Sequence, residues 1–293
     1  MKNLEKEMEK FAELVIGKLR TLYPNLEFRY QNVRKNNGLI LHGIILKDDK
    51  QIAPNIYLDD AFSEYKNGRS LDMIVSHISE IYEQSRKIEM VIDFTDYEKV
   101  KKLIRFKLVN TERNAEYLTS IPHDDFLDLS KVYYLRLDDS KDGMATTVIT
   151  NELLTIWKKE KEKIALQAAE NVRKEISFIS MEKVLREAVD IEMMGFEYCP
   201  LYVLTNKSRV YGAALMGCED MLKYISDTMK KESFIILPSS IHEVLILFDS
   251  DTNGYELQGM VKEINDTQVA MDEILSYNIY KYEKGKGISI IES

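Results

Sequence analysis

Apolar residues follow a helical spacing at the start of the chain. Between residues 4 and 23 they recur every three or four positions, which places them on one stripe of a helix. Pro24 ends this helix, because proline disfavours helical backbone in the residue before it. A helix that binds a partner or a membrane surface is the alternative, but the polar face mixes Glu and Lys, so we expect the stripe to pack into a core. The stripe consists of Leu4, Met8, Phe11, Leu14, Val15, Leu19 and Leu22.

The pattern becomes strand-like between residues 26 and 58. Alternating apolar residues lead into a continuous apolar run at 38–46, and extended structure resumes at 52–58 after a polar turn. This pattern predicts a hairpin. Helices are expected at residues 59–65 and 70–86, with Gly68 separating them.

The middle of the chain combines short helices with a second hairpin. Residues 96–110 begin with helical spacing and end as a strand, whereas residues 122–129 look like a loop followed by a turn. Strands are predicted at 132–137 and 144–149. Thr150 or Asn151 then caps a long helix over residues 152–174.

The last third repeats the same alternation. Helices are predicted at 181–194, 219–230 and 256–265, and strands at 201–204 and 211–216. The most strongly β-forming stretch is 233–248, in which two apolar runs are joined by Pro-Ser-Ser. The end of the chain, at 288–291, is expected to be an edge strand.

Hairpins followed by helices recur along the chain. These units lie at about 38–66, 132–174, 201–230 and 234–265. Helices grouped with antiparallel hairpins predict an α+β fold, here with a long central helix. That helix is the expected junction between two sub-domains, residues 1–150 and 151–293, although one continuous domain is also compatible with the pattern.

The charge balance narrows the range of partners. The chain has 293 residues, of which 45% are hydrophobic and 30% are charged, and its formal net charge is -9. An acidic protein is not attracted non-specifically to nucleic acid or to anionic membranes, so neither is expected as a partner. No apolar run approaches the roughly 20 residues that span a bilayer. The N-terminus lacks the apolar segment of a signal peptide, so we expect a cytoplasmic protein.

Neither a metal nor a cofactor is expected. Cys199 and Cys218 have no metal-binding spacing and are predicted to be buried thiols in neighbouring strands. The four histidines have no short mutual spacing, and His242-Glu243 lacks the second histidine of HExxH. Glycine-rich phosphate loops are absent from the sequence.

Two acidic turns resemble the first half of a calcium loop. Residues 138–143 and 249–254 place oxygen-bearing side chains at alternate positions before a glycine, as hard cations require. The twelfth position should be a bidentate glutamate but is Ile149 in one loop and Met260 in the other. Ordinary hairpin turns explain the same residues. A calcium-stabilised protein remains a third alternative.

The densest set of reactive side chains lies between the two apolar runs, at Ser239, Ser240, His242 and Glu243. Strand side chains alternate, so Ser240 and His242 share one face. A hydrolase could use these two residues, with Asp124 or Glu243 orienting the imidazole. No oxyanion hole or complete triad is visible, which favours a structural or contact role. Contact roles are also assigned to Ser239, His123, Asp124 and Asn206.

Several blocks of the sequence together resemble an uncharacterised protein family from anaerobic gut Firmicutes. The blocks are Asn37–Gly43, Pro54–Leu58, Pro122–Leu129, Tyr202–Asn206, Tyr211–Ala214, Leu237–Val244 and Val261–Val269, with Leu275, Ser276 and Tyr280. The resemblance covers about residues 30–283. It implies a bacterial, intracellular, single-module protein and no particular reaction.

These observations predict a non-enzymatic intracellular protein that binds or regulates a protein partner, or that self-associates. The absence of a complete catalytic set and the acidic composition favour this function. A hydrolase using Ser240 and His242 is the alternative.

Overall fold

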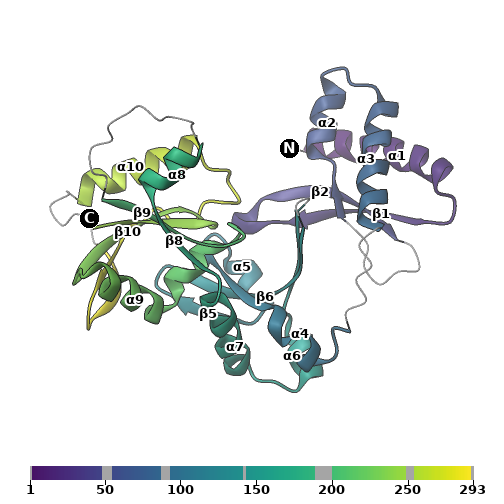
Figure 1. Cartoon of the computed structure of the whole chain (residues 1–293). Coiled ribbons are helices and arrows are strands. Elements are labelled where there is room, and N and C mark those ends of the chain that lie inside the picture. The colour runs from purple at the N-terminus through teal and green to yellow at the C-terminus, as the bar shows by residue number, and fades with distance from the viewer. Residues whose placement is uncertain are drawn as a thin grey trace. The chain divides into compact units, whose positions relative to one another are not determined.

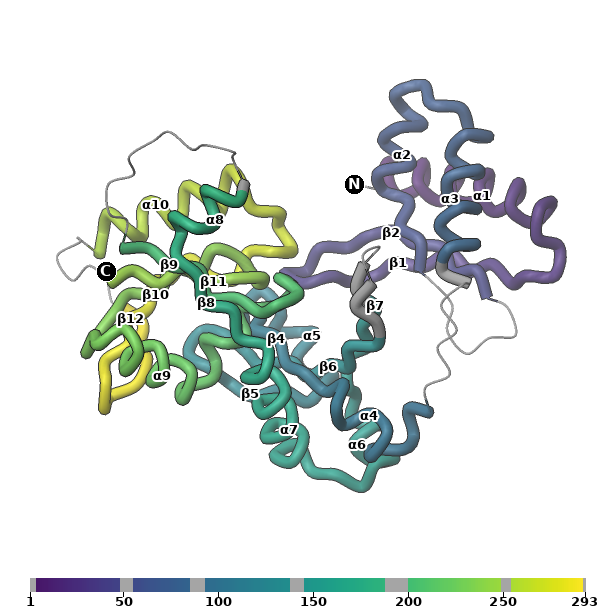
Figure 2. The backbone as a smooth tube through the Cα atoms, viewed as in Figure 1, coloured from purple at the N-terminus to yellow at the C-terminus, as the bar shows by residue number. Residues whose placement is uncertain are grey.

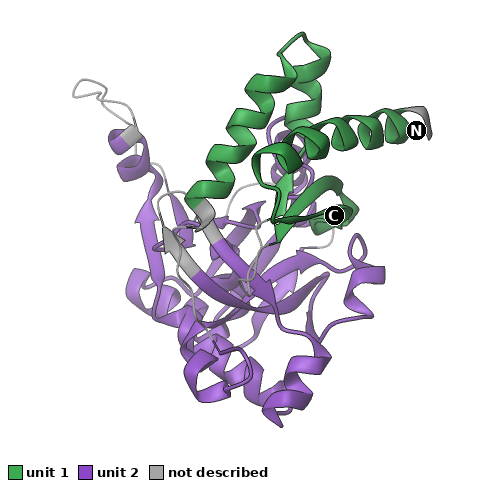
Figure 3. Cartoon of the chain, turned by 90° about the vertical axis from the view of Figure 1, so that its right-hand side faces the viewer, with its two compact units in different colours: residues 1–92 green, residues 93–293 purple. Residues whose placement is uncertain are grey.

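The computed structural model describes residues 2–47, 55–86, 93–140, 143–188, 200–248 and 254–291 (Figure 1). The chain divides into two compact units, which we call the N-terminal unit (residues 1–92) and the C-terminal unit (residues 93–293; Figure 3). Both combine antiparallel sheets with helices, which confirms the α+β class. Residue 150, the boundary expected from the sequence, lies inside the C-terminal unit.

The N-terminal unit contains a three-stranded sheet in the order β1-β2-β3, with β1 Glu27–Arg34, β2 Ile40–Lys47 and β3 Asn55–Tyr57. Helices α1 (Lys2–Leu22), α2 (Asp59–Lys66) and α3 (Leu71–Arg86) pack with it. The predicted apolar stripe of α1 buries Phe11, Val15 and Leu19 against Ile44 and the other strand residues of one continuous core. The helical spacing correctly predicted the burial of Met8, Phe11, Val15 and Leu19, whereas Leu4, Leu14 and Leu22 of the same stripe are exposed.

A four-stranded sheet opens the C-terminal unit. It begins after α4 (Tyr97–Val100) and η2 (Lys101–Leu103). Strand β6 (Leu129–Ser140) pairs with β4 (Ile104–Asn110), β5 (His123–Phe126) and β7 (Gly143–Val148), and α5 (Ala115–Leu118) lies in the connection before β5. Helix α7 (Lys161–Arg173) packs on β4 and β6 through buried apolar side chains that include Ile164 and Ala168.

A six-stranded antiparallel sheet completes the C-terminal unit (Figure 2). Its order is β13-β12-β10-β11-β9-β8, which makes β13 an edge strand as predicted. The strands are β8 Ile176–Ser180, β9 Leu201–Asn206, β10 Ser233–Ser240, β11 Glu243–Leu247, β12 Tyr280–Glu283 and β13 Gly287–Ile290. Helices α8 (Met181–Ala188), α9 (Glu219–Met229) and α10 (Gly254–Thr267) connect them. The predicted strand pair at 233–248 forms the centre of this sheet as β10 and β11.

The long central helix is interrupted in the structure. It consists of α6 (Asn151–Trp157) and α7, separated at Lys158, which has left-handed backbone with φ of 52°. Six consecutive charged residues, 158–163, lie between Trp157 and Ile164. No apolar side chain in this stretch can hold a continuous helix against the core, so the chain turns there.

Three further segments differ from their predicted structure. Residues 211–216 were expected to be a strand but form most of the buried 3-10 helix η3 (Gly212–Gly217), which contacts β4, β9 and β11. The predicted loop at 122–129 contains strand β5, and β8 was not predicted at all. Cys218 accordingly follows η3 and caps α9 without lying in a strand, although it is buried as expected.

Some predicted features fall on residues that the structure does not describe. They include Cys199, residues 141–142 of the first acidic turn, residues 249–253 of the second, residues 52–54 of the strand expected at 52–58 and residues 189–194 of the helix expected at 181–194. Among the described helices, none combines the length and the apolar character that crossing a membrane requires.

Candidate functional site

His242 lies in the turn between β10 and β11, and both of its ring nitrogens have partners. Nδ1 accepts a hydrogen bond from the backbone N–H of Tyr211 at 3.2 Å. Nε2 lies 3.4 Å from Oε1 of Glu273. An accepting Nδ1 leaves the proton of the neutral ring on Nε2, facing this carboxylate. The imidazole therefore tethers the chain before η3 to the segment that follows α10.

Ser240 is positioned by the same turn and not by the imidazole. Its Oγ accepts a hydrogen bond from the backbone N–H of His242 at 3.0 Å. Ser239 occupies the bulge where the β10–β11 register shifts, and Glu243 pairs with Ser240 across the strands. A nucleophilic serine needs a base that can take its proton. The contacts of the described residues give Ser240 no such base.

The ring of Tyr211 is enclosed by side chains from both sheets of the C-terminal unit. His242 stacks on it at 5.7 Å between ring centroids, with an interplanar angle of 11°. Tyr134 of β6 meets it edge-on at 5.4 Å, and Nζ of Lys107 of β4 lies 4.7 Å from its centroid. Burial raises the pKa of the Tyr134 hydroxyl. We call Lys107, Tyr134, Tyr211, His242 and Glu273 the His242 cluster.

The backbone around Tyr211 is held in an unusual conformation. Arg209 and Tyr211 both have left-handed backbone, with φ of 55° and 56°. The side chain of Asn206 holds this turn by donating to the carbonyl of Val210 at 2.7 Å and accepting from its N–H at 3.2 Å. Tertiary contacts must offset such strain, and the partners of Tyr211 provide them. The Asn206 side chain thus stabilises the turn.

Gly212 explains why the chain comes so close to β9 at this point. A Cβ at Gly212 would lie 2.2 Å from Oγ1 of Thr205 and 2.6 Å from the carbonyl oxygen of His242. Thr205 Oγ1 donates to that same carbonyl at 2.8 Å. The absence of a side chain therefore allows η3 to pack between the two sheets. The His242 cluster joins these sheets, which is a structural role.

The remaining predicted contact residues belong to a separate group on β5. Asp124 pairs with Lys161 of α7 at 2.5 Å and accepts a hydrogen bond from the hydroxyl of Tyr133. Burial alone would raise the pKa of Asp124, but Lys161 and Tyr133 outweigh it and hold the pKa below its usual value. His123 donates from Nδ1 to the carbonyl of Ile121 at 3.0 Å. These contacts fasten α7 and β5 to β6.

His42 lies in the N-terminal unit, where its ring and backbone both contact Asp59. Its Nδ1 is 2.8 Å from Oδ1 of Asp59, and its backbone N–H donates to Oδ2 at 2.8 Å. The histidines at 42, 123 and 242 therefore have different partners. Within the described part of the chain, groups of three or more His, Cys, Asp or Glu that could hold a metal ion are absent.

Sequence reasoning did not identify the carboxylate–arginine cluster of the C-terminal unit. Glu175 accepts hydrogen bonds from Arg105 of β4 at 2.6 Å and from Arg136 of β6 at 2.5 Å, and its side chain is 15% exposed. Burial would raise the pKa of Glu175, but the two guanidinium groups hold it below its usual value. Because the three residues are far apart in the chain, no local pattern could reveal them.

A second cluster, also missed from the sequence, is centred on Asp128. Its carboxylate accepts from Ser276 Oγ at 2.6 Å, Asn278 Nδ2 at 3.0 Å and Tyr280 Oη at 2.9 Å. Burial, and then the charge of Asp128, raise the pKa of Tyr280. The cluster links the turn between β5 and β6 to the segment that leads into β12. The resemblance had included Asp128, Ser276 and Tyr280, but nothing in the sequence indicated that they meet.

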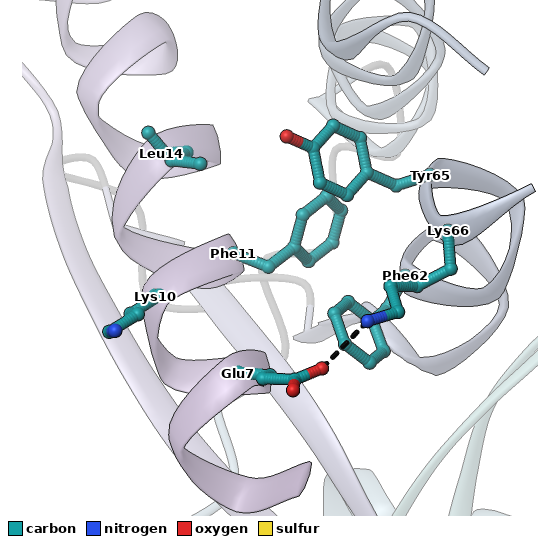
Figure 4. A pocket seen from close by; sticks show the side chains of 7 residues that line it. All are labelled: Glu7, Lys10, Phe11, Leu14, Phe62, Tyr65 and Lys66. Carbon is teal, nitrogen blue, oxygen red and sulfur yellow. Dashed lines mark hydrogen bonds and ion pairs between the residues drawn. The ribbon is translucent and has the colours of Figure 1, made fainter. Parts of the chain in front are cut away.

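An open apolar groove lies between α1 and α2 of the N-terminal unit (Figure 4). Its volume is about 200 Å³, and its lining is formed by Glu7, Lys10, Phe11, Leu14, Phe62, Tyr65 and Lys66. The ring of Phe11 lies at the base, 5.4 Å from Phe62 and 5.1 Å from Tyr65. Leu14 is 49% exposed and Tyr65 is 36% exposed. Leu14 was part of the predicted stripe of α1, so only its exposure distinguishes it from the core residues.

The rim of this groove is charged. Lys66 donates to Glu7 at 2.7 Å across one end, as the dashed line in Figure 4 shows. Lys10 makes no hydrogen bond or ion pair with the described part of the chain. In Figure 4 its ammonium group points away from the rings of Phe11 and Phe62. The groove therefore offers an apolar floor with charged side chains at its border.

The comparison with known families assigns the sequence but no activity. Residues 8–284 match a family whose description is family of unknown function, DUF5688. No curated protein matches the chain, and no solved structure does.

Proposed function

The chain belongs to DUF5688, a family of unknown function, and we propose that it is a non-enzymatic protein that binds a partner protein through the groove between α1 and α2. The groove is the observation that carries this proposal. It contains Phe11, Leu14, Phe62 and Tyr65, and aromatic and aliphatic anchors of this kind provide most of the binding energy in protein interfaces.

The size of the groove favours a protein side chain over a metabolite. Small-molecule sites usually enclose roughly 300–1,000 Å³. The present groove, at about 200 Å³, is smaller and open, and it accommodates one or two large side chains. An amphipathic helix that inserts a Leu or Phe between two helices is a common form of such recognition.

The charges of the N-terminal unit support a specific partner chemistry. This unit has 14 basic and 14 acidic residues, so its net charge is zero. Long-range repulsion therefore does not oppose an acidic partner there. Lys10 can pair with a carboxylate beside the inserted side chain. The proposed occupant is an amphipathic helix with an apolar anchor and a neighbouring Asp or Glu.

Two features of the C-terminal unit are consistent with a role that does not involve catalysis. Both ring nitrogens of His242 have partners, and Ser240 accepts a hydrogen bond from backbone. The bacterial origin and intracellular location that the resemblance implied are part of this proposal, and so is the expectation of a protein partner.

The test combines purification with a groove variant. We expect the tagged protein, isolated from its own cells, to carry one stoichiometric partner that can be identified and produced separately. Calorimetric titration with this purified partner should give saturable binding. Leu14→Arg places a charge in the groove and should weaken binding at least tenfold.

Leu22→Arg is the matched control, because Leu22 lies on the same helix, is 58% exposed and does not line the groove. This variant should bind as the unmodified protein does. A partner that binds Leu14→Arg and the unmodified protein equally well would overturn the proposal, as would the isolation of an unaccompanied monomer.

A further inference from the structure

Helix α10 has a buried face with exposed apolar side chains along one edge. Leu257, Val261 and Asn265, spaced four residues apart, are buried, and the first two pack on Ile235 of β10. Figure 1 shows α10 on the outside of the C-terminal unit. Two apolar side chains along the edge of this buried face are exposed, Met260 by 56% and Ile264 by 46%, and they lie one helical turn apart. A further methionine, Met271, is 51% exposed after the helix.

Two carboxylates lie beside this exposed stripe, on the side away from the buried face. Glu256 lies four residues before Met260 and Glu263 three residues after it, so both are its neighbours on the helix surface. Residues 254–273 contain five acidic residues and a single lysine, Lys262. That lysine pairs with Asp266 at 2.7 Å, which satisfies its charge within the helix. The face around Met260 is therefore both apolar and negative.

Methionine is common on surfaces that accept varied apolar partners, because its side chain is flexible and polarizable. A surface that combines exposed methionine with carboxylates complements a helix that has apolar and basic faces. We propose that the exposed strip of α10 formed by Met260 and Ile264, with Glu256 and Glu263 beside it, binds a cationic amphipathic helix of a partner protein.

The charge of the C-terminal unit favours this occupant over two others. The unit has 26 basic and 35 acidic residues, so it carries the entire net charge of -9. A second copy of the chain would bring the same negative charge to the interface, and an anionic membrane would repel this face. A basic helix gains from the same field, which also accelerates its association.

The probe is a synthetic 20-residue peptide with Leu at helical spacing and Lys at the other positions, carrying a fluorophore for anisotropy measurements. We expect saturable binding to the full chain at 0.15 M salt. Replacing both apolar side chains, Met260→Gln with Ile264→Gln, should weaken binding at least tenfold. Glu263→Lys should weaken it at least fivefold and reduce its dependence on salt.

Two controls separate specific docking from general attraction to an acidic protein. Glu116→Lys changes the net charge by the same amount at another exposed position of the unit, and it should leave binding within twofold of the unmodified protein. A peptide of the same composition with its Leu residues scattered around the helix should bind at least tenfold more weakly. Circular dichroism verifies that each variant is folded.

Several results would overturn the proposal. They are equal binding of the two peptides, an equal effect of Glu116→Lys and Glu263→Lys, the absence of peptide binding, or a dimer of the chain that only the Met260 and Ile264 variant abolishes. Leu14→Arg should not affect peptide binding at α10, so this experiment and the groove experiment can fail independently.

Discussion

The imidazole of His242 stacks on the ring of Tyr211 and also accepts a hydrogen bond from the backbone N–H of the same residue, at 3.2 Å. One histidine thus holds both the side chain and the left-handed backbone of Tyr211. The stretch with the densest reactive side chains in the sequence therefore serves as a junction between two sheets. The geometry of Ser240 follows from the same turn.

Replacing His242 should loosen this junction. His242→Ala removes the stack and the acceptor for the Tyr211 N–H, so we expect a loss of roughly 1–3 kcal/mol in the free energy of unfolding. Trp157, the single tryptophan, is buried in the C-terminal unit and reports its unfolding in urea by fluorescence. His77→Ala, at an exposed histidine of the N-terminal unit, should not shift this transition.

Nitrogen NMR tests the contact of the His242 ring directly. It should find the proton of the neutral ring on Nε2, because Nδ1 accepts a hydrogen bond from the Tyr211 N–H. A proton on Nδ1 would contradict this contact.

Two glycines should respond to alanine in opposite directions. Gly212→Ala forces a Cβ against Thr205 and the His242 carbonyl, and overpacking of this kind costs roughly 1–3 kcal/mol. Gly259 lies within α10 with open space around its Cβ position, so Gly259→Ala should stabilise the protein by about 0.5–1 kcal/mol through helix propensity. Urea unfolding of both variants measures the difference. If Gly212→Ala left the free energy of unfolding unchanged, η3 would have to be able to move away from β9.

The Glu175 cluster should make stability depend on pH. Arg105 and Arg136 depress the folded pKa of Glu175, so its stabilising contribution is complete above the usual glutamate pKa of about 4.3 and is lost as the pH falls through the lower folded value. Glu175→Gln should cost roughly 3 kcal/mol at neutral pH, because it leaves two guanidinium groups without their carboxylate.

The same variant should flatten the stability profile as the pH falls below the usual glutamate pKa of about 4.3, because it lacks the carboxylate whose depressed pKa makes the unmodified protein lose stability there. Urea titrations at several pH values provide this profile. Glu170→Gln is the control, since Glu170 forms a solvent-exposed pair with Lys174 and should have little effect at neutral pH. Equal effects of the two substitutions would mean that the Glu175 pairs behave like surface pairs.

Substitutions in the Asp128 cluster should also destabilise the protein. Asp128→Ala leaves the donors of Ser276, Asn278 and Tyr280 without their shared acceptor, and we expect a loss of about 3 kcal/mol. The neighbouring Asp125 is exposed, so Asp125→Ala should be close to neutral. Thermal unfolding compares the two. If Asp128→Ala reduced the stability no more than Asp125→Ala does, water molecules would have to replace the Asp128 carboxylate as acceptor for the three donors.

Local patterns in the sequence determined much of the secondary structure. The spacing of apolar residues defined α1, α3 and α10, because a helix that packs on a core must present one apolar side. The two apolar runs around Pro238 became the central strands β10 and β11 for the corresponding reason, since β-branched residues pack well on a sheet. The α+β class followed from the order of these elements.

Tertiary structure decided the segments whose local pattern was ambiguous. Residues 211–216 are as apolar as a strand, but β9 already pairs with β8 and β11, so no free edge is available to them there. They form η3 instead, with Gly212 allowing the close approach. Strand β5 is similarly created by its pairing with β6 and not by its own polar residues.

The candidate sites show the same division. Sequence alone could name Ser240, His242 and Asp124 as reactive side chains, because residue type is local information. It could not determine their partners, since Tyr211, Glu273 and Lys161 are distant in the chain and meet these residues only after folding. Exposure is also a property of the whole fold, so only the structure separated Leu14 and Met260, which face solvent, from the apolar residues that form the core.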